Sequence, residues 1–292
     1  MPRQKALFLL LFTAVCWSCS GVLVKSVSWN PLAIASTRGL LAGITVFALA
    51  GGFKGELKIK DLTLVHFASG LSLAILSLFF IVAMKFTTAA NAIVLNYSAP
   101  VWVAILAPCV IKERTKGRDW LYIGVIFGGV LLFFAGDLSP VGFWGNICAL
   151  GSGFFFGVQA LCLRFLKKGS PASAMVIGNL LTFCLGLGFW GPPWPDSRSL
   201  LFLLALGVFQ MGVSSYLYTL ASPYVSSLEL VLVTMVEPIL NPFWVFLALG
   251  ERPGPFALVG GIIVILGVMV WSFGKNGESL PLPPREKGHG NS

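Results

Sequence analysis

The sequence predicts an all-α polytopic membrane protein with ten transmembrane helices that form two inverted five-helix repeats. Three observations lead to this fold class. Apolar residues make up 57% of the 292 residues and charged residues 11%, whereas a typical soluble domain has about 25% charged residues. The apolar residues gather in runs close to the ~20 residues that a helix needs to cross a bilayer. One sequence pattern also occurs twice, 138 residues apart.

The apolar runs, taken in order along the chain, define the expected helices. They cover residues 6–24, 31–52, 62–84, 88–111, 119–136, 142–164, 171–191, 199–220, 225–249 and 255–273. The first run follows a basic start, but no small-x-small cleavage site closes it, so we expect a retained span rather than a signal peptide. We assign residues 1–137 and 138–274 to the two repeats. Residues 275–292 combine prolines with mixed charges, and we expect a disordered cytoplasmic tail there.

The distribution of basic residues predicts the orientation of the chain. With the N-terminus inside, 15 of the 20 lysines and arginines fall on the inner side, 4 fall on the outer side and Arg38 lies within a span. Inner loops carry the excess of Lys and Arg, so both termini should be cytoplasmic, in a bacterial cytoplasmic (inner) membrane. The net charge of +9 does not indicate a nucleic-acid partner, because the basic residues form no single exposed face.

All six cysteines lie in or beside apolar runs, where cysteine acts as a small hydrophobic residue. Cys16 and Cys19 have the CxxC spacing of a redox or metal site, but no second pair accompanies them. We therefore expect no disulfide framework, no metal site and no cofactor.

The internal repeat consists of a proline within a span and a Glu-Arg pair 13 residues later. Pro100 is followed by Glu113–Arg114, and Pro238 by Glu251–Arg252. The Glu-Arg pairs should lie at helix ends, as surface ion pairs. Five spans separate the two copies, so the two halves should cross the membrane in opposite directions. Many secondary transporters build a site at the membrane midplane from such inverted halves.

The residues around this repeat resemble a known family. Segments Ala83–Gly136 and Ala221–Gly274 are similar to the EamA repeat of the drug/metabolite transporter superfamily. Trp17, Lys25 and Arg38 stand where that family often has a tryptophan, a lysine and an arginine. The resemblance implies ten helices in two inverted halves and a central cavity open to one side at a time. It further implies export or exchange of small organic metabolites such as amino acids or amines, without specifying the substrate.

Charged residues within spans are functional candidates, because a charge in lipid is costly. Glu237 lies about 12 residues into its span, or ~18 Å from the inner side, and Arg38 lies ~20 Å from the same side of a ~30 Å core. The two could form a structural pair, or Glu237 could be held beside the helix break at Pro238. Alternatively, they could bind substrate or couple its transport to protons. Glu229 is only ~6 Å deep, so we expect it to be solvated at the interface.

Polar side chains on common helix faces complete the candidate site. Thr234, Glu237, Asn241 and Trp244 share a face by their spacing, as do Asn91, Ser98 and Trp102. Interhelical hydrogen bonds could explain each polar residue singly, whereas their convergence would indicate a transport site. The candidate substrate-binding or coupling residues are Glu237, Arg38, Asn241, Trp244, Thr234, Asn91, Ser98, Trp102, Gln159, Gln210 and Trp17.

Three glycine pairs have GxxxG spacing, which favours close helix packing. These pairs are Gly39/Gly43, Gly124/Gly128 and Gly153/Gly157. Such a face could pack within one chain or join two copies, so a monomer and a homodimer both remain open.

The function that the sequence favours is secondary active transport of a small molecule across the lipid bilayer, with protons as an open choice of coupling ion. The alternative is an intramembrane enzyme, or a channel without coupled transport. The chain has no HExxH, GxSxG or P-loop pattern, and its only histidines are His66 and His289. We therefore expect neither an enzyme nor an ATP-driven pump.

Overall fold

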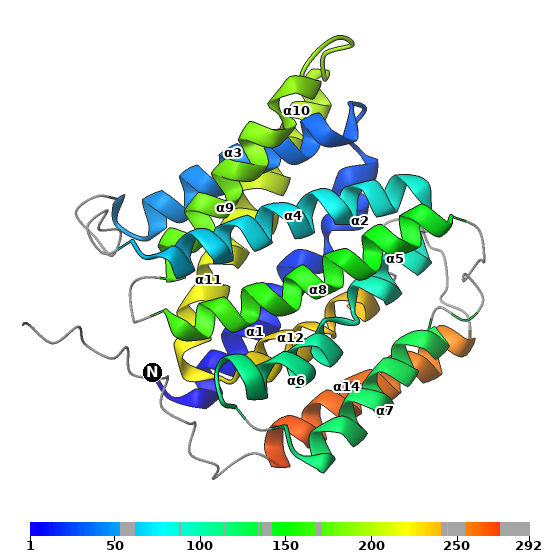
Figure 1. The fold of residues 1–292 in the computed structure, drawn as a ribbon. Helices are drawn as coiled ribbons and strands as arrows, with labels where there is room; N and C mark the ends of the chain where they lie inside the picture. The colour runs from blue at the N-terminus through cyan, green and yellow to red at the C-terminus, as the bar shows by residue number, and fades with distance from the viewer. Residues whose placement is uncertain are drawn as a thin grey trace, which may run out of the picture.

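The computed structural model is a bundle of helices (Figure 1), and the residues that it describes form no strand. The all-α fold class is therefore confirmed. The expected tail, residues 275–292, lies outside the described residues. The structure describes residues 1–52, 62–87, 89–113, 115–133, 135, 142–166, 171–240, 244 and 255–274.

The described helices fall into two parts, before and after residue 138. The first part contains α1 (Arg3–Ser18), α2 (Ser20–Lys25), α3 (Pro31–Leu49), α4 (Leu64–Phe86), α5 (Ala89–Asn96), α6 (Ala99–Val110) and α7 (Gly117–Phe133). The second part contains α8 (Phe143–Phe165), α9 (Pro171–Gly186), η3 (Leu187–Phe189), α10 (Ser197–Leu204), η4 (Ala205–Val213), α11 (Ser214–Ala221), η5 (Ser222–Tyr224), α12 (Ser227–Thr234) and α14 (Pro255–Gly274). The segments η3 and η5 are 3-10 turns, and η4 is a π-helix.

Each of the ten predicted ranges overlaps at least one described helix. Among the described residues, six helical segments are long and apolar enough to cross a membrane, and Val259–Trp271 is a shorter apolar helix. The exact number of ten spans stays a prediction. The six segments are Pro31–Leu49, Leu64–Ala83, Asn91–Val110, Phe143–Phe165, Pro171–Phe189 and Ser197–Tyr224.

Two helices are interrupted at equivalent places in the repeat. A turn at Tyr97 and Ser98 separates α5 from α6, and a turn at Met235 and Val236 follows α12. The two turns are 138 residues apart, the same offset as in the sequence repeat. Each precedes a repeat proline by two or three residues. Proline has no N–H and its ring clashes with the carbonyl four residues earlier, so it breaks the helix at this point.

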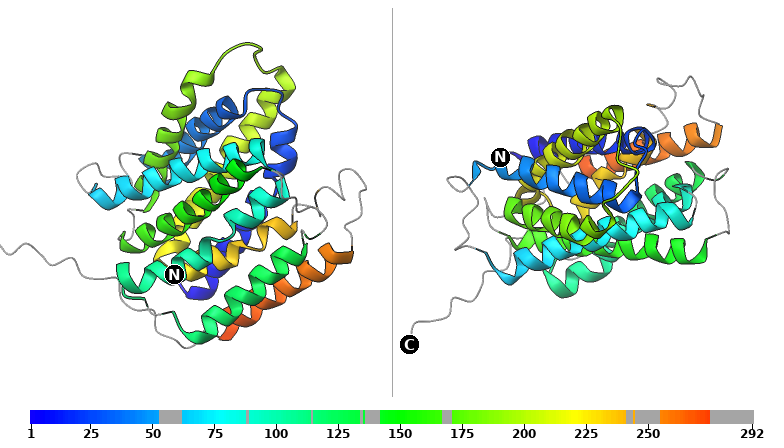
Figure 2. Two further views of the ribbon diagram at one scale, coloured as in Figure 1. Left: turned by 45° about the vertical axis from the view of Figure 1, so that its right-hand side comes forward. Right: turned by 90° about the horizontal axis from the view of Figure 1, so that it is seen from above.

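The helices pack as neighbours in a layered bundle. Helix α4 packs against both α8 and α9, and α3 packs against α9 and η4. Helices α7 and α14 pack against each other at one edge of the molecule, as Figures 1 and 2 show. Helices α1 and α11 pack together, and α12 lies against α1, α6 and α8. The chain thus surrounds the short helix α12 with other helices.

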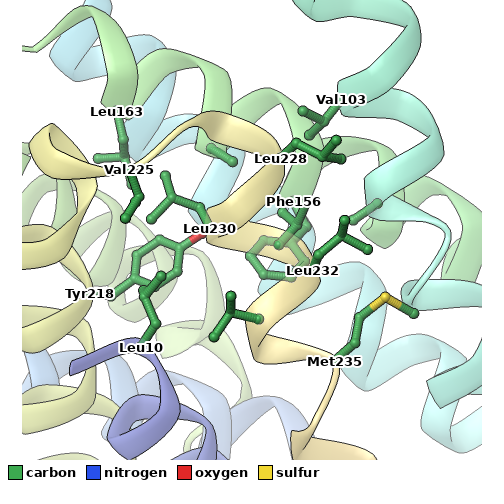
Figure 3. Packing of buried hydrophobic residues seen from close by; sticks show 14 of the residues in the cluster. Leu10, Val103, Phe156, Leu163, Tyr218, Val225, Leu228, Leu230, Leu232 and Met235 are labelled. Carbon is green, nitrogen blue, oxygen red and sulfur yellow. The ribbon is translucent and has the colours of Figure 1, made fainter. Parts of the chain in front are cut away.

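Every residue of α12 is buried, and its apolar side chains lie at the centre of the largest apolar cluster. Figure 3 shows Leu230 and Leu232 among Leu10, Phe156 and Tyr218 from neighbouring helices. Within a bilayer, helices associate through close packing and interhelical hydrogen bonds, because lipid tails are as apolar as leucine. The position of α12 is therefore set by complementary packing on all sides.

The predicted close packing at GxxxG pairs holds at two of the three pairs. A Cβ atom added to Gly39 would lie 2.7 Å from the carbonyl oxygen of Asn179, and one added to Gly153 would lie 2.6 Å from that of Asn96. By contrast, Cβ atoms added to Gly124 and Gly128 would meet no atom of the described chain within 4 Å. The pair on α7 therefore faces outward.

Candidate functional site

Glu237, the carboxylate that the sequence predicts near the middle of the membrane, has an unexpected hydrogen-bond partner. The Tyr97 hydroxyl donates to Oε2 of Glu237 and lies 3.4 Å from the carbonyl oxygen of Thr234. That carbonyl would accept the helical hydrogen bond of residue 238, but Pro238 has no N–H to donate. The break after α12 therefore leaves the Thr234 carbonyl without its helical hydrogen bond and places it beside the Glu237 carboxylate. The Tyr97 hydroxyl contacts both oxygens.

Arg38 faces this group from α3. Both Arg38 and Glu237 are half-buried, and their charges act on each other. Within the described residues, however, no ion-pair contact of 4.0 Å or less joins the two; the described close ion pairs are Arg3–Glu229 and Arg164–Glu113. Arg38 and Glu237 therefore interact electrostatically at longer range than an ion pair. The direct hydrogen-bond partner of Glu237 is Tyr97.

Three buried polar atoms without a partner among the described residues belong to one cluster, whose Tyr218 lies within electrostatic range of Tyr97. They are Nε1 of Trp17, Oε1 of Gln210 and the hydroxyl of Tyr218. The three side chains are neighbours, because the Trp17 and Tyr218 rings are 5.4 Å apart and Nε2 of Gln210 donates to the Trp17 carbonyl at 3.5 Å. Each unpartnered buried polar group costs about 1–3 kcal/mol. Together they offer two donors and an acceptor within one small region of the bundle.

Gln210 owes its position to an uncommon local structure. It lies in η4, a nine-residue π-helix between α10 and α11. π-Helical turns are rare and occur often at functional sites, because the wider turn redirects side chains that an α-helix would stack.

At the end of α1, the Ser18 hydroxyl accepts a hydrogen bond from Nε1 of Trp244 at 2.7 Å. Asn241 lies outside the described residues.

The structure corrects the two predicted helix faces. The turn at residues 235–236 separates Thr234 from Glu237, and the turn at residues 97–98 separates Asn91 from Trp102. Neither set therefore lies on one continuous helix. Thr234 donates back to the carbonyls of its own helix. The reason is the proline that follows each turn, because it ends the regular helical spacing on which a common face depends.

The remaining candidates make contacts away from Glu237. Asn91 donates to Thr87 and Asn146, and Ser98 accepts from Nε1 of Trp102 at 3.1 Å. Gln159 is buried and donates to the Met175 sulfur at 3.4 Å. Of the described candidates, Ser98, Thr234 and Glu237 thus lie at or beside the helix breaks, and Arg38 lies within electrostatic range of Glu237. Trp17 and Gln210 belong to the cluster with Tyr218.

The expected solvation of Glu229 is wrong. Its side chain is 2% exposed, and Nε of Arg3 lies 2.8 Å from its Oε1. Glu113 also takes part in an ion pair, and its described partner is Arg164, whose Nε lies 2.8 Å from Oε1 of Glu113. Arg114 lies outside the described residues, as do Glu251 and Arg252. The physical reason is tertiary: arginines distant in sequence reach both carboxylates and satisfy their charge inside the protein.

Comparison with known proteins identifies the chain. The family described as the EamA-like transporter family matches residues 4–135 and again residues 143–273. The chain belongs to the EamA-like transporter family. As a member of it, the chain is an integral, multi-pass membrane protein and a membrane transporter. The expected resemblance is therefore confirmed, with one matched segment on each side of residue 138.

Similar proteins cover most of the EamA-like chain. A protein named "uncharacterized transporter" from Archaeoglobus fulgidus is 27% identical over 91% of this chain and 96% of its own length. Another of the same name from Methanothermobacter thermautotrophicus is 24% identical over 83% of this chain and 78% of its own length. A solved structure, titled "Crystal structure of protein", has a TM-score of 0.82 at 18% identity and covers 94% of this chain and 100% of its own. This likeness shows the fold.

Sequence reasoning missed two tyrosines of the EamA-like bundle. Tyr97 and Tyr218 are both buried, and each lies in a segment that reads as apolar. The sequence held one usable signal for Tyr97, since it stands three residues before the repeat proline Pro100. Tyr218 carries no comparable signal, because its proximity to Trp17 arises only when α1 and α11 pack together.

Proposed function

We propose that this protein is a secondary active transporter that exports or exchanges small organic metabolites by alternating access, with its binding site at the two helix breaks. In alternating access, one site opens in turn to each side of the membrane. The observation that carries the proposal is the hydrogen bond between Tyr97 and Glu237, which joins the two breaks. Broken helices at midplane depth, in corresponding positions of two halves, are the mark of such a site.

The directions of α5 and α12 support two inverted halves. Helix α5 begins near the start of α8, where Asn91 donates to Asn146 at 3.2 Å. Helix α12 begins near the end of α8, where Glu113 pairs with Arg164 and accepts from the Ser227 N–H. The two short helices therefore start at opposite ends of α8, and their C-terminal ends meet at Tyr97. Inverted repeats with ten spans are the arrangement that we propose for the whole chain.

The charges at the breaks favour a substrate that carries an amine. The C-terminal ends of helices carry a partial negative charge, which α5 and α12 both direct at the site. Glu237 adds a carboxylate, while Arg38 keeps a cation within electrostatic range. An amine or amino acid would find acceptors at Glu237 and Gln210 and donors at Trp17 and Tyr218. A proton on Glu237 is the coupling that we propose as its counterpart.

The orientation that we propose follows from the basic residues. Their inward excess sets both termini in the cytoplasm of a bacterial cell, with the protein in the cytoplasmic membrane. Export would then carry the metabolite from the side of residues 3 and 164 toward the opposite side.

Counterflow in proteoliposomes tests the proposal. Purified protein is reconstituted into vesicles that contain an excess of one unlabelled compound, and uptake of the labelled compound is followed across a panel of amino acids, amines, nucleosides and sugars. We expect transient accumulation for at least one compound, with an initial rate that saturates with concentration. Linear, non-saturating flux would favour the channel alternative, and chemical conversion of the compound would favour an enzyme.

A further inference from the structure

The start of α12 is held by two carboxylates, one from its own first turn and one from the segment that follows α6. Glu229, in the first turn of α12, accepts the Ser226 N–H at 2.6 Å, while the Ser226 hydroxyl accepts the Glu229 N–H at 3.3 Å. Glu113, which follows α6, accepts the Ser227 N–H at 3.3 Å. The first N–H groups of a helix have no partner within it. Here two negative charges satisfy them, where the helix dipole also favours negative charge.

Each carboxylate is in turn paired with an arginine from a different helix. Arg3 of α1 binds Glu229 through Nε and Nη2, and Arg164 of α8 binds Glu113 through Nε. We call Arg3, Glu113, Arg164 and Glu229 the α12 clasp. The exposed fractions of Arg164 and Glu229 are 4% and 2%. The clasp therefore closes one end of the bundle by joining α1, α8, α12 and the end of α6.

At the opposite end, the described hydrogen bonds at the corresponding position join neutral side chains. The repeat offset of 138 places Asn91, at the start of α5, in the position of Glu229. Asn91 donates to Thr87 at 3.1 Å and to Asn146 at 3.2 Å, and Thr87 donates to Asn146 at 2.7 Å. Hydrogen bonds between charged groups are roughly twice as strong as those between neutral groups. Among the described residues, the contacts that hold the start of α12 are thus the stronger of the two sets.

We propose that the α12 clasp is the gate at the end of the bundle that holds residues 3 and 164, the predicted cytoplasmic side. Opening the central site to that side requires the clasp to separate, which moves α12 away from α1 and α8. The cluster of Thr87, Asn91 and Asn146 is the weaker gate at the other side. The protein without substrate therefore opens more readily to the outside. This inference rests on the proposed alternating access.

Cysteine accessibility at the helix break tests the proposal without a substrate. All six native cysteines, which are free, are first replaced. Val236, a half-buried residue of the turn beside Glu237, is then changed to cysteine as the reporter. A membrane-impermeant maleimide is applied to right-side-out and to inside-out membrane vesicles, and the labelling rate is measured from each side.

Two variants weaken the clasp in different ways. Glu229→Gln retains an acceptor for the Ser226 N–H, since Gln serves at this position of a capping box, but it loses the ion pair with Arg3. The double variant Arg3→Gln with Glu229→Gln leaves no unpaired charge and so guards against misfolding of the single variant. The matched control, Asn146→Ala, weakens the opposite cluster.

The clasp variants should label at least fivefold faster than the reporter parent in inside-out vesicles, without a rise in right-side-out vesicles. Asn146→Ala should do the reverse. Unchanged labelling of an inserted double variant would overturn the gate, as would an equal rise from both sides. Failure of both clasp variants to insert would assign the clasp to folding and also overturn it. Saturable counterflow with unchanged labelling would reject the clasp alone, whereas the predicted labelling without counterflow would reject only the proposed transport.

Discussion

Tyr97 donates a hydrogen bond to Glu237 between two short helices that start at opposite ends of the bundle. The residues are 140 apart in the sequence, and each stands at or beside a turn that a repeat proline enforces. The pair thus joins the two halves of the chain at a place where both interrupt their helical hydrogen bonding. A relative movement of the halves must change this contact, which makes it the natural place for a substrate to act.

Changing Tyr97 to Phe should lower the counterflow rate about tenfold or more while the protein still inserts and folds. The change removes only the hydroxyl, and a hydrogen bond to a charged group contributes ~1.5–3 kcal/mol. Tyr122→Phe is the matched control, because Tyr122 lies on the peripheral helix α7. An equal loss of rate in both variants, or no loss in Tyr97→Phe, would remove Tyr97 from the site.

The charges of Arg38 and Glu237 should depend on each other for stability. Arg38→Gln alone removes the cation within electrostatic range of the Glu237 carboxylate. The loss of stability should be smaller than the ~3–5 kcal/mol that breaking a buried pair in direct contact costs. The double change Arg38→Gln with Glu237→Gln should recover much of the thermal stability lost by Arg38→Gln, as measured by the melting temperature in detergent. It should not recover transport. Full wild-type transport by the double variant would exclude both residues from the mechanism.

Gly153→Ala should destabilise the protein, whereas Gly124→Ala should not. A methyl group on Gly153 would lie 2.6 Å from both the Asn96 carbonyl and the Ser98 hydroxyl, and relieving such overlap costs typically 1–3 kcal/mol. A methyl group on Gly124 meets no described atom within 4 Å, and alanine is the better helix former. Thermal unfolding of the two variants in the same detergent makes the comparison. Equal melting temperatures would contradict the close contact between α8 and the α5–α6 turn.

The topology gives four labelling sites in a cysteine-free background. Lys168→Cys and Lys287→Cys should react with an impermeant maleimide only from the cytoplasm. Lys25→Cys and Arg198→Cys should react only from outside, because the inward excess of basic residues sets this orientation. Cytoplasmic labelling of Arg198→Cys would disprove the ten-span arrangement.

The sequence was sufficient to predict an all-helical membrane protein with long apolar helices, because apolar runs of membrane length have few other interpretations. It also indicated a helix break at Pro238 and placed Pro100 within a span at the same offset of 138 residues. Their effect on neighbouring residues was missed in the helix-face arithmetic. That error could have been avoided, because a proline within a span ends the regular spacing on which a common face depends.

The partners of the charged residues could not be predicted in the same way. Glu229 was expected at the solvated interface from its depth alone, yet Arg3 reaches it from 226 residues away. Glu237 was matched with Arg38 by depth, while the direct hydrogen bond comes from Tyr97. Depth along a span is a one-dimensional quantity. Which side chains meet at that depth depends on how the helices pack around one another. The spacing of residues along one sequence does not determine this packing.

The most direct test of the account is the counterflow rate of Glu237→Gln, measured with the compound that the wild-type protein transports. Asp196→Asn is the matched control, because it makes the same acid-to-amide change at an exposed helix cap outside the spans, where asparagine is an equally good capping residue. We predict that Glu237→Gln falls to the rate of protein-free vesicles while Asp196→Asn keeps the wild-type rate. A wild-type rate and KM for Glu237→Gln would contradict a transport site at the two helix breaks.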